Sequence, residues 1–488
     1  MLLWRIVLRY GAAVIVLVFY VTASLHFSYT PDETYVYLQY GRNIAWGEGV
    51  SFNAGSSSYG VTGPLWAFLI AAGAKLNLDP YIVAKTLDIV FASVAVMAVL
   101  AFAFVVIRDR LYALVAAWIF SFDAWFLRWA GSGTETSLAI LLAMLSLWYA
   151  YKKEYITSSL VAGLLTLVRP EGVLLFLAAQ VDSVLDSRSR ISAIRVVVGS
   201  VVVYLMIVGT WLGFSYIHFG TMLPNQLRSA PFTGFSWSTM VANAFAHMKI
   251  VGATQMFLVL LLVGGVVVTV RKFGWHLIRE EGFPLIWALA VPLWCVMFNV
   301  EAASRQVLLV LPVFVVYGLW GLKRLEIASY VSQRRVISIL LLVAGISLAQ
   351  NQVVYRGLIL PHMNNLELGV NECLKPIAYW LRTNTPAGTT VLTPQAGVIG
   401  YVSERTVFDA SGTIAPEVRR AFGGESYDSG LVKRKYEAVI HPDYIIDRSS
   451  TPERLAGETM KPVMTRTFPG LGITKPDLVY YTLYKVVR

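Results

Sequence analysis

The stretch SYTPDETYVYLQYGRNIAWGEGVSFN, from Ser28 to Asn53, places two adjacent carboxylates directly after a long apolar segment. That apolar segment, near residues 7–27, is long enough to cross a bilayer, which takes roughly 20 mostly apolar residues. Asp32 and Glu33 therefore stand where the chain leaves the membrane. Paired acids alone carry little information, but this position makes them candidates for chemistry at the membrane surface.

The composition of the whole chain agrees with a membrane protein. Of its 488 residues, 57% are hydrophobic and 14% are charged, and the mean hydropathy is +0.62. Soluble domains carry about 25% charged residues, so the sequence predicts a polytopic α-helical membrane protein and argues against a soluble enzyme. We expect about eleven transmembrane helices. They lie near 7–27, 79–107, 111–127, 136–151, 155–168, 171–185, 196–217, 251–270, 283–300, 306–322 and 336–352.

Two of these segments leave alternatives open. The N-terminal segment is interpreted as a retained first span, with a cleaved signal peptide as the alternative. The segments 155–168 and 171–185 are short and are separated by LVRPEG, so they could form a re-entrant pair that preserves the sidedness of everything after them.

Basic residues indicate which side of the membrane each loop occupies. Cytoplasmic loops carry an excess of Lys and Arg, so we place the N-terminus, with Arg5 and Arg9, in the cytoplasm. The alternate loops then hold most other basic residues of the first 352 positions, and this accounts for part of the net charge of +11 without nucleic acid. These residues are Arg108, Arg110, Lys152, Lys153, Arg188, Arg190, Arg195, Arg271, Lys272, Arg279, Lys323, Arg324, Arg334 and Arg335.

The same topology gathers the polar inter-span stretches on the outer side, as expected for a cavity at the outer leaflet. These stretches are the first outer loop, 28–63, then RWAGSGTETS (128–137), VRPEG (168–172), FGTMLPNQ (219–226) and EAASRQ (301–306). After about residue 353 the composition becomes that of a soluble domain. One amphipathic helix, CLKPIAYWLRTNTPAG, and the strand-like segments TTVLT, RTVFDA, PDYIID and LVYYTLYKVV predict an extracytoplasmic α/β domain over 353–488, beyond a membrane domain over 1–352.

The first outer loop begins with a helix-compatible run that stops near Gly47. Its tyrosines and Trp46 favour an amphipathic helix lying along the outer surface. Asp32 follows a proline and could simply cap this helix. The functional interpretation is that Asp32 is a general base for sugar transfer, while Glu33 raises its pKa, binds a metal or holds the acceptor. Adjacent helical residues point about 100° apart, so both acids need not enter one site.

These features together resemble the GT-C glycosyltransferases, polytopic enzymes that use polyprenyl-phosphate sugars as donors. The DE pair resembles the acidic motif of protein O-mannosyltransferases and of the lipid A aminoarabinose transferase. The wider pattern is similar to the mycobacterial arabinofuranosyltransferase group, in which we would expect Asp-Asp instead of Asp-Glu. It consists of YGRNIAWGEGVSFN, YGVTGPLW, GTETSL, LVRPEG, FGTMLPN and, in the distal domain, AGVIGYVSERTVFDASG.

The resemblance implies an inverting transfer in which Asp32 deprotonates an acceptor hydroxyl. The sugar, a pentose such as arabinofuranose or a hexose, would leave its polyprenyl phosphate for a cell-envelope glycan or lipid. The phosphate needs cationic support, and Arg128, Arg169 and Arg305 are each a lone cation at the outer end of a predicted span. We favour Arg305, because its loop is otherwise poor in cations; the structural alternative pairs these arginines with Glu135, Glu171 or Glu301.

Four further residues are candidates for contacting acceptor, donor or metal. Glu135 and Glu171 could bind sugar hydroxyls or a divalent cation, or pair within the bundle. Asn225 could donate to a sugar or form an ordinary turn, and Tyr59 could stack on a sugar or anchor at the interface. The sequence leaves the need for a metal open, and no histidine pair has metal-ligand spacing.

Two other classes of function compete with the transferase. A transporter or flippase of lipid-linked sugars would also have many spans, but it would favour internal repeats and charges near the bilayer midplane. A non-catalytic lipid- or glycan-binding scaffold is the third interpretation, and it predicts no transfer.

Overall fold

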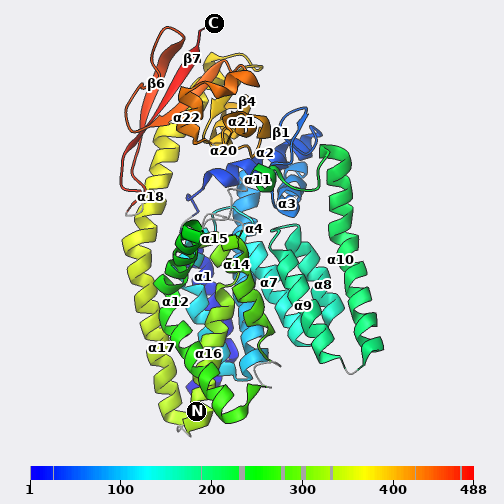
Figure 1. Cartoon of the computed structure of the whole chain (residues 1–488). Coiled ribbons are helices and arrows are strands. Elements are labelled where there is room, and N and C mark those ends of the chain that lie inside the picture. The colour runs from blue at the N-terminus through cyan, green and yellow to red at the C-terminus, as the bar shows by residue number, and fades with distance from the viewer. Residues whose placement is uncertain are drawn as a thin grey trace.

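The computed structural model describes residues 2–25, 27–187, 189–229, 237–275, 281–297, 304–329, 333–423, 425–472 and 475–487. Figure 1 shows a helical bundle with the N-terminus at one end and an α/β domain, which carries the C-terminus, beyond the other end. A thin layer of short helices and a hairpin separates the two. This layer is the first outer loop with its neighbours, and Asp32 and Glu33 lie in it.

The bundle contains four helical segments that are long and apolar enough to cross a membrane, judged by length and composition within the described residues. They are Pro80–Ile107, Arg190–Phe219, Trp237–Lys272 and Arg334–Asn384. Six shorter apolar helices accompany them. These features are those of a polytopic membrane protein, whereas the expected number of about eleven spans stays a prediction.

Thirteen helices of the described residues make up the bundle. Their bounds are α1 (Leu2–Ser24), α4 (Pro80–Ile107), α5 (Arg110–Ser121), α6 (Ala124–Trp129), α7 (Thr136–Tyr151), α8 (Tyr155–Thr166), α9 (Gly172–Asp186), α10 (Arg190–Phe219), α12 (Trp237–Phe273), α14 (Phe283–Met297), α15 (Ser304–Val307), α16 (Leu311–Ser329) and α17 (Gln333–Val354). Glycines allow α12 and α16 to pack closely. A Cβ on Gly265 would lie 2.2 Å from the Cα of Gly321, so only small residues fit at this crossing, as is common between membrane helices.

Helix α12 is kinked at Gln255, where φ is −129° and ψ is 15°. The carbonyl groups that the kink frees accept hydrogen bonds from side chains of α17: Gln350 donates to Gly252 and Ala253, and Asn351 donates to Thr254. The Oδ1 of Asn351 also accepts from the amide of Ala124, at the start of α6. The kink is therefore stabilised by polar groups that are otherwise rare in a membrane helix.

The layer above the bundle is built from α2 (Asp32–Trp46), the hairpin β1 (Ser51–Asn53) and β2 (Ser56–Ser57), α3 (Pro64–Lys75) and α11 (Asn225–Ser229). The sequence prediction of a helix after Pro31 is confirmed. Two acids in the first turn of α2 suit the positive end of its dipole. The helix ends at Gly47, which has a φ of +83° and donates to Asn43 and Ile44, a conformation that favours glycine.

The distal domain has a mixed five-stranded sheet in the order β4-β3-β5-β7-β6. Its elements are β3 (Thr390–Thr393), α20 (Ala396–Ser403), β4 (Thr406–Asp409), α21 (Pro416–Phe422), α22 (Tyr427–Val432), η3 (Lys435–Ala438), β5 (Tyr444–Ser449), β6 (Met460–Phe468) and β7 (Val479–Val486). Strands β3, β4 and β5 pair in parallel, and β7 pairs antiparallel with β5 and β6. The four predicted strands are confirmed, and β6 is an additional one.

A single continuous helical path joins the bundle to the distal domain. It runs from α17 through η1 (Tyr355–Ile359), α18 (Leu360–Gly369) and η2 (Val370–Leu374) to α19 (Lys375–Asn384). The composition shift near residue 353 thus lies inside this helix (Figure 1). Each π-helical turn is followed by a proline, Pro361 or Pro376, which lacks the amide hydrogen of a regular helix.

The kink in α12 gives a stability prediction. Replacing Asn351 with Leu removes partners from buried backbone groups, and each such group left unsatisfied costs about 1–3 kcal/mol. We therefore expect Asn351→Leu to lower the free energy of unfolding in detergent by at least this amount, measured by thermal or denaturant unfolding. Val353→Ala on the same helix, where the valine is 73% exposed, is the control; an equal effect of both variants would contradict the assignment.

Candidate active site

Helix α2 presents different faces to the two parts of the protein. Asp32 and Arg42 contact the distal domain, whereas Glu33 contacts the bundle. Thr34, one residue further, donates to the carbonyl of Ser132 in the loop before α7. The adjacent acids therefore enter different surroundings, as their angular separation on a helix predicts.

The carboxylate of Asp32 accepts two backbone hydrogen bonds from the N-terminus of α20. The amide of Gly397 lies 3.1 Å from Oδ2, and that of Val398 lies 2.8 Å from Oδ1. Burial raises the pKa of Asp32, the two amides lower it, and the nearby carboxylates of Glu33 and Asp409 raise it, so that the pKa stands at about 7. The residue keeps partial exposure. Because each carboxylate oxygen has a second lone pair, Asp32 can still accept a proton at a pH near neutrality.

Arg42, on α2, contacts the C-terminal end of α20. Its Nη1 lies 3.4 Å from the carbonyl oxygen of Tyr401 and 3.3 Å from Oε1 of Glu404, which follows the last residue of α20. Helices α2 and α20 therefore run side by side in the same direction. A negative charge faces the positive end of the α20 dipole and a positive charge faces its negative end, an arrangement that stabilises the contact.

Glu33 forms an ion pair with Arg305, whose Nη1 lies 3.4 Å from Oε1. Their side chains are 45% and 24% exposed, so the pair is accessible. A single, half-exposed contact of this kind contributes little to stability. A more strongly charged anion can therefore displace Glu33 from Arg305. Glu301, from the same predicted loop, lies outside the described residues.

Glu135, Arg169 and Glu171 form a buried ionic cluster at the ends of α7, α8 and α9. The guanidinium of Arg169 lies 3.3 Å from Glu135 and 3.1 Å from Glu171, and all three side chains are nearly inaccessible. The cluster carries one more negative than positive charge. The second carboxylate oxygen of each glutamate accepts no hydrogen bond within the described part of the chain. Because Arg169 already pairs with two carboxylates, it is less able than Arg305 to bind a phosphate.

Arg128 has neutral partners. Its Nε lies 3.2 Å from the Tyr29 hydroxyl, and its Nη2 lies 2.9 Å from Nε2 of His362 on α18. Nδ1 of His362 lies 3.2 Å from the carbonyl of Leu471. A carbonyl can only accept, so Nδ1 carries the hydrogen and Nε2 accepts from Arg128. No carboxylate pairs with Arg128 among the described residues, so its positive charge is available to an anion.

Tyr59 and Asn225 lie in contacts between the loop and its neighbours. The Tyr59 ring stacks on Phe219, and its hydroxyl accepts from Nε1 of Trp211. The Asn225 amide donates to Tyr59, and its side chain donates to Ser58 and Thr413. Both residues are almost fully buried, so these contacts fix the loop against α10 and the distal domain.

Sequence reasoning missed a second polar constellation inside α4. Lys85 is fully buried and donates to the carbonyls of Tyr29 and Gly131, while Asp88 accepts from the amide of Gly133. Together they hold the start of the first outer loop and the loop before α7. The signal was present, because two charges three residues apart in an apolar span are costly unless they have a role.

Asp409, in the distal motif, was also missed as a structural centre. Its buried carboxylate accepts from the amides of Thr413, Ile414 and Ala415 and so shapes the loop after β4. No three His, Cys, Asp or Glu side chains are grouped to hold a metal ion in the described ranges.

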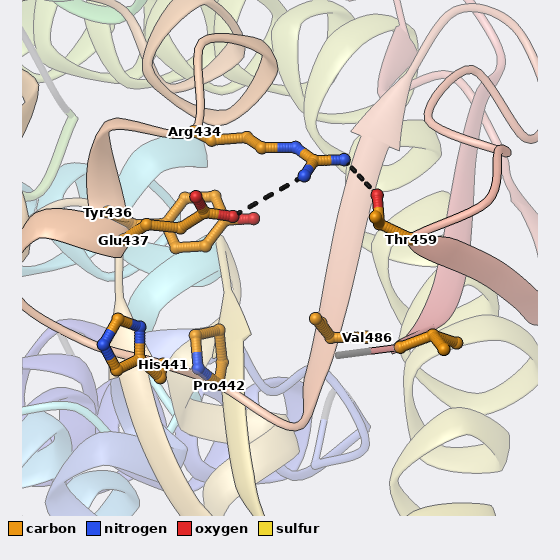
Figure 2. A pocket seen from close by; sticks show the side chains of 8 residues that line it. Arg434, Tyr436, Glu437, His441, Pro442, Thr459 and Val486 are labelled. Carbon is orange, nitrogen blue, oxygen red and sulfur yellow. Dashed lines mark hydrogen bonds and ion pairs between the residues drawn. The ribbon is translucent and has the colours of Figure 1, made fainter.

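Two hollows lie away from these residues. One, of about 290 Å³ in the distal domain, is lined by residues that include Arg434, Tyr436 and His441. Figure 2 shows Arg434 between Glu437 and Thr459, with a dashed line to each. The other, of about 650 Å³, is an apolar groove between α9 and α14. Neither hollow is lined by any of the candidate residues. The candidate site is therefore described by the contacts of its side chains and not by a cavity.

Comparisons with known proteins bear first on the distal domain and then on the whole fold. A family model described as "Domain of unknown function (DUF8728)" matches residues 362–484. A comparison with curated protein sequences finds no match. The apo crystal structure of the Archaeoglobus fulgidus oligosaccharyltransferase is similar with a TM-score of 0.61 and 12% identity, over 90% of this chain and 69% of that chain.

Two further solved structures are similar over nearly the whole chain. Apo ArnT from Cupriavidus metallidurans has a TM-score of 0.56 and 14% identity, over 98% of this chain and 97% of ArnT. The arabinofuranosyltransferase AftD from Mycobacteria has a TM-score of 0.50 and 16% identity, over 98% of this chain but 40% of AftD. The chain therefore has the fold of the GT-C glycosyltransferases, which confirms the resemblance seen in the sequence at the level of the fold.

The buried ionic cluster gives a second prediction. Arg169→Met would leave Glu135 and Glu171 buried without their cation, and breaking such a pair costs about 3–5 kcal/mol. We expect a large fall in the melting temperature at neutral pH, measured by differential scanning fluorimetry in detergent. Lys433→Met, which removes an exposed partner of Glu425, should leave it near the wild-type value. Equal melting temperatures for the two variants would show that the cluster contributes no stability.

Proposed function

We propose that the protein is an inverting membrane glycosyltransferase that moves a sugar from a polyprenyl-phosphate donor to a cell-envelope glycan or lipid. The observation that carries this proposal is the start of α2 at one end of a GT-C bundle: Asp32 is held there by α20, its neighbour Glu33 contacts Arg305, and Tyr29, three residues earlier, contacts Arg128. The carboxylate has a pKa of about 7, which suits a general base near neutral pH. The arginines suit an anionic leaving group.

In this mechanism Asp32 takes the proton from the acceptor hydroxyl. The acceptor oxygen forms a bond to the anomeric carbon while the bond from that carbon to the phosphate oxygen breaks, so the anomeric configuration inverts. Polyprenyl phosphate leaves with the bonding electrons. The negative charge on the phosphate grows in the transition state. Fixed guanidinium groups therefore stabilise the transition state more than the ground state, which lowers the barrier.

Arg305 is our first candidate for the donor phosphate, and Arg128 is the second. The weak contact between Arg305 and Glu33 means that a phosphate, with its greater charge, can displace the carboxylate. Glu33 then becomes free to hold the acceptor. Glu135 and Glu171 have unused oxygens that suit donor or acceptor hydroxyls, or a divalent cation supplied with the donor. Tyr59 and Asn225 support the loop on which these groups stand.

The sugar is proposed as a pentose such as arabinofuranose, or a hexose. We place the protein in the cell or inner membrane with its N-terminus in the cytoplasm and with Asp32 and the distal domain outside, as the basic loops predict. A transporter or flippase of lipid-linked sugars is the competing function, and the next experiment separates the two.

The catalytic prediction concerns Asp32. Purified protein should transfer label from at least one member of a panel of radiolabelled polyprenyl-phosphate sugars. Asp32→Asn should lower transfer by about 10²–10⁴-fold, the usual contribution of a general base. The variant should still bind the donor. The wild-type rate should rise with pH to a plateau above an apparent pKa near 7, because the base acts in its deprotonated form.

Equal transfer by wild type and Asp32→Asn would remove Asp32 from the mechanism. Movement of the donor across vesicle membranes without transfer would favour the transporter. Binding of donor without either activity would favour a scaffold.

The phosphate prediction concerns Glu33 and Arg305. If the carboxylate competes with phosphate, Glu33→Gln should tighten binding of a polyprenyl phosphate, and Arg305→Met should weaken it by about tenfold or more, as loss of a charge-assisted hydrogen bond implies. Binding is measured by microscale thermophoresis with the purified variants. Arg405→Met, in the distal domain, is the control. Unchanged binding in Arg305→Met would transfer the role to Arg128.

A further inference from the structure

The contact between Asp32 and α20 links two segments that are 365 residues apart in the sequence. Both oxygens of the carboxylate are held by backbone amides of the distal domain, so rotation of the side chain is restricted. The amides belong to the part of the chain matched by the domain of unknown function. The position of the proposed base is therefore set by a domain outside the bundle.

Two glycines in the motif AGVIGY make this contact possible. A Cβ on Gly397 would lie 2.1 Å from the backbone oxygen of Asp32, a distance that no real contact shows. A Cβ on Gly400, one turn further, would lie 2.5 Å from the ring of Phe52 in β1. The first outer loop thus packs directly on the backbone of α20, with one glycine at the base and the other at an apolar residue beside it.

Other contacts hold the two segments in register. The side chain of Asn53 donates to the carbonyl of Val407 and accepts from its amide, both at 2.9 Å. It thereby pairs with the backbone of the edge strand β4. Arg42 and Glu404 close the far end of α20. A shift of α20 along α2 by one residue would break the hydrogen bonds of Asp32 and of Arg42, so these contacts fix the register of the two helices.

We propose that α20 is a positioning element of the catalytic centre, and that the distal domain serves the transfer reaction by holding the Asp32 carboxylate in place. The proposal rests on the proposed function in so far as Asp32 is the base. Gly397 acts through Asp32 and is a positioning residue. The domain of unknown function thereby acquires a role: without it, the base would be free to rotate at the membrane surface.

This arrangement also sets the proton affinity of the base. Burial opposes the charged form, the amides of Gly397 and Val398 stabilise it, and the carboxylates of Glu33, on α2, and Asp409, at the end of β4, oppose it. The hydroxyls of Tyr35, on α2, and Tyr481, on β7, also lie within range of its charge. A small displacement of α20 that lengthens these two hydrogen bonds while the carboxylate stays buried would raise the pKa of Asp32.

The experiment compares Gly397→Ala with Gly400→Ala in the full-length protein. Both add one methyl group to the same face of α20, but only the first meets Asp32. Gly397→Ala should lower kcat by about a hundredfold, the cost of a displacement near 1 Å, and should move the rising limb of the pH–rate profile to higher pH. Gly400→Ala should leave the limb where it is in the wild type. Equal kcat values and equal limbs for the two variants would overturn the proposal.

A second measurement does not depend on activity or on the stability of the glycine variants. Hydrogen exchange of the amides of Gly397 and Val398 is followed in the wild type and in Asp32→Ala, with the amides of β4 as the internal reference. Loss of the carboxylate should speed exchange at these two amides by about tenfold or more, because charge-assisted bonds protect them. Equal exchange would overturn the proposal whether or not the wild type transfers sugar, whereas absence of transfer with faster exchange would overturn the proposed function and leave α20 as the element that holds the Asp32 carboxylate.

Discussion

The structure depends on the parallel packing of α2 against α20, because this contact joins the membrane bundle to the distal domain through charge as well as shape. Asp32 faces the positive end of α20, and Arg42 faces the negative end. A charge withdrawn from water needs such partners, and neither helix could supply them alone. The same contact fixes where the proposed base stands, so folding of the interface also assembles this part of the candidate site.

Adjacent residues of a helix point about 100° apart, so Asp32 and Glu33 face two different surfaces. Asp32 belongs to the interface with the distal domain, and Glu33 belongs to the bundle, where it meets Arg305. The three candidate arginines differ in the same physical terms. Arg169 is neutralised by two buried carboxylates, Arg305 shares one exposed carboxylate, and Arg128 has neutral partners. Arg169 is therefore less available to a phosphate than either Arg305 or Arg128.

The sequence predicted what local pattern can reveal. Helix α2, its proline and glycine boundaries, and the strands β3, β4, β5 and β7 follow from periodicity and turn residues. The contact of Asp32 with Gly397 could not be predicted, since backbone amides leave no residue signature and the two positions are far apart in the chain. The glycines of AGVIGY were visible, but their purpose depends on what lies opposite. The role of Lys85 was hidden for a similar reason: its partners are carbonyls, which every residue has.

The composition shift near residue 353 predicted a boundary at a point where the backbone instead continues as one helix from Arg334 to Asn384. At 1.5 Å per residue, its 51 residues form a rod of about 76 Å. Its outer end, α19, packs on α20 (Figure 1). A rod anchored in the bilayer and attached to the sheet is a lever: tilting its lower half to match a thinner membrane swings its upper half. Such a tilt would therefore reach the contact between α2 and α20.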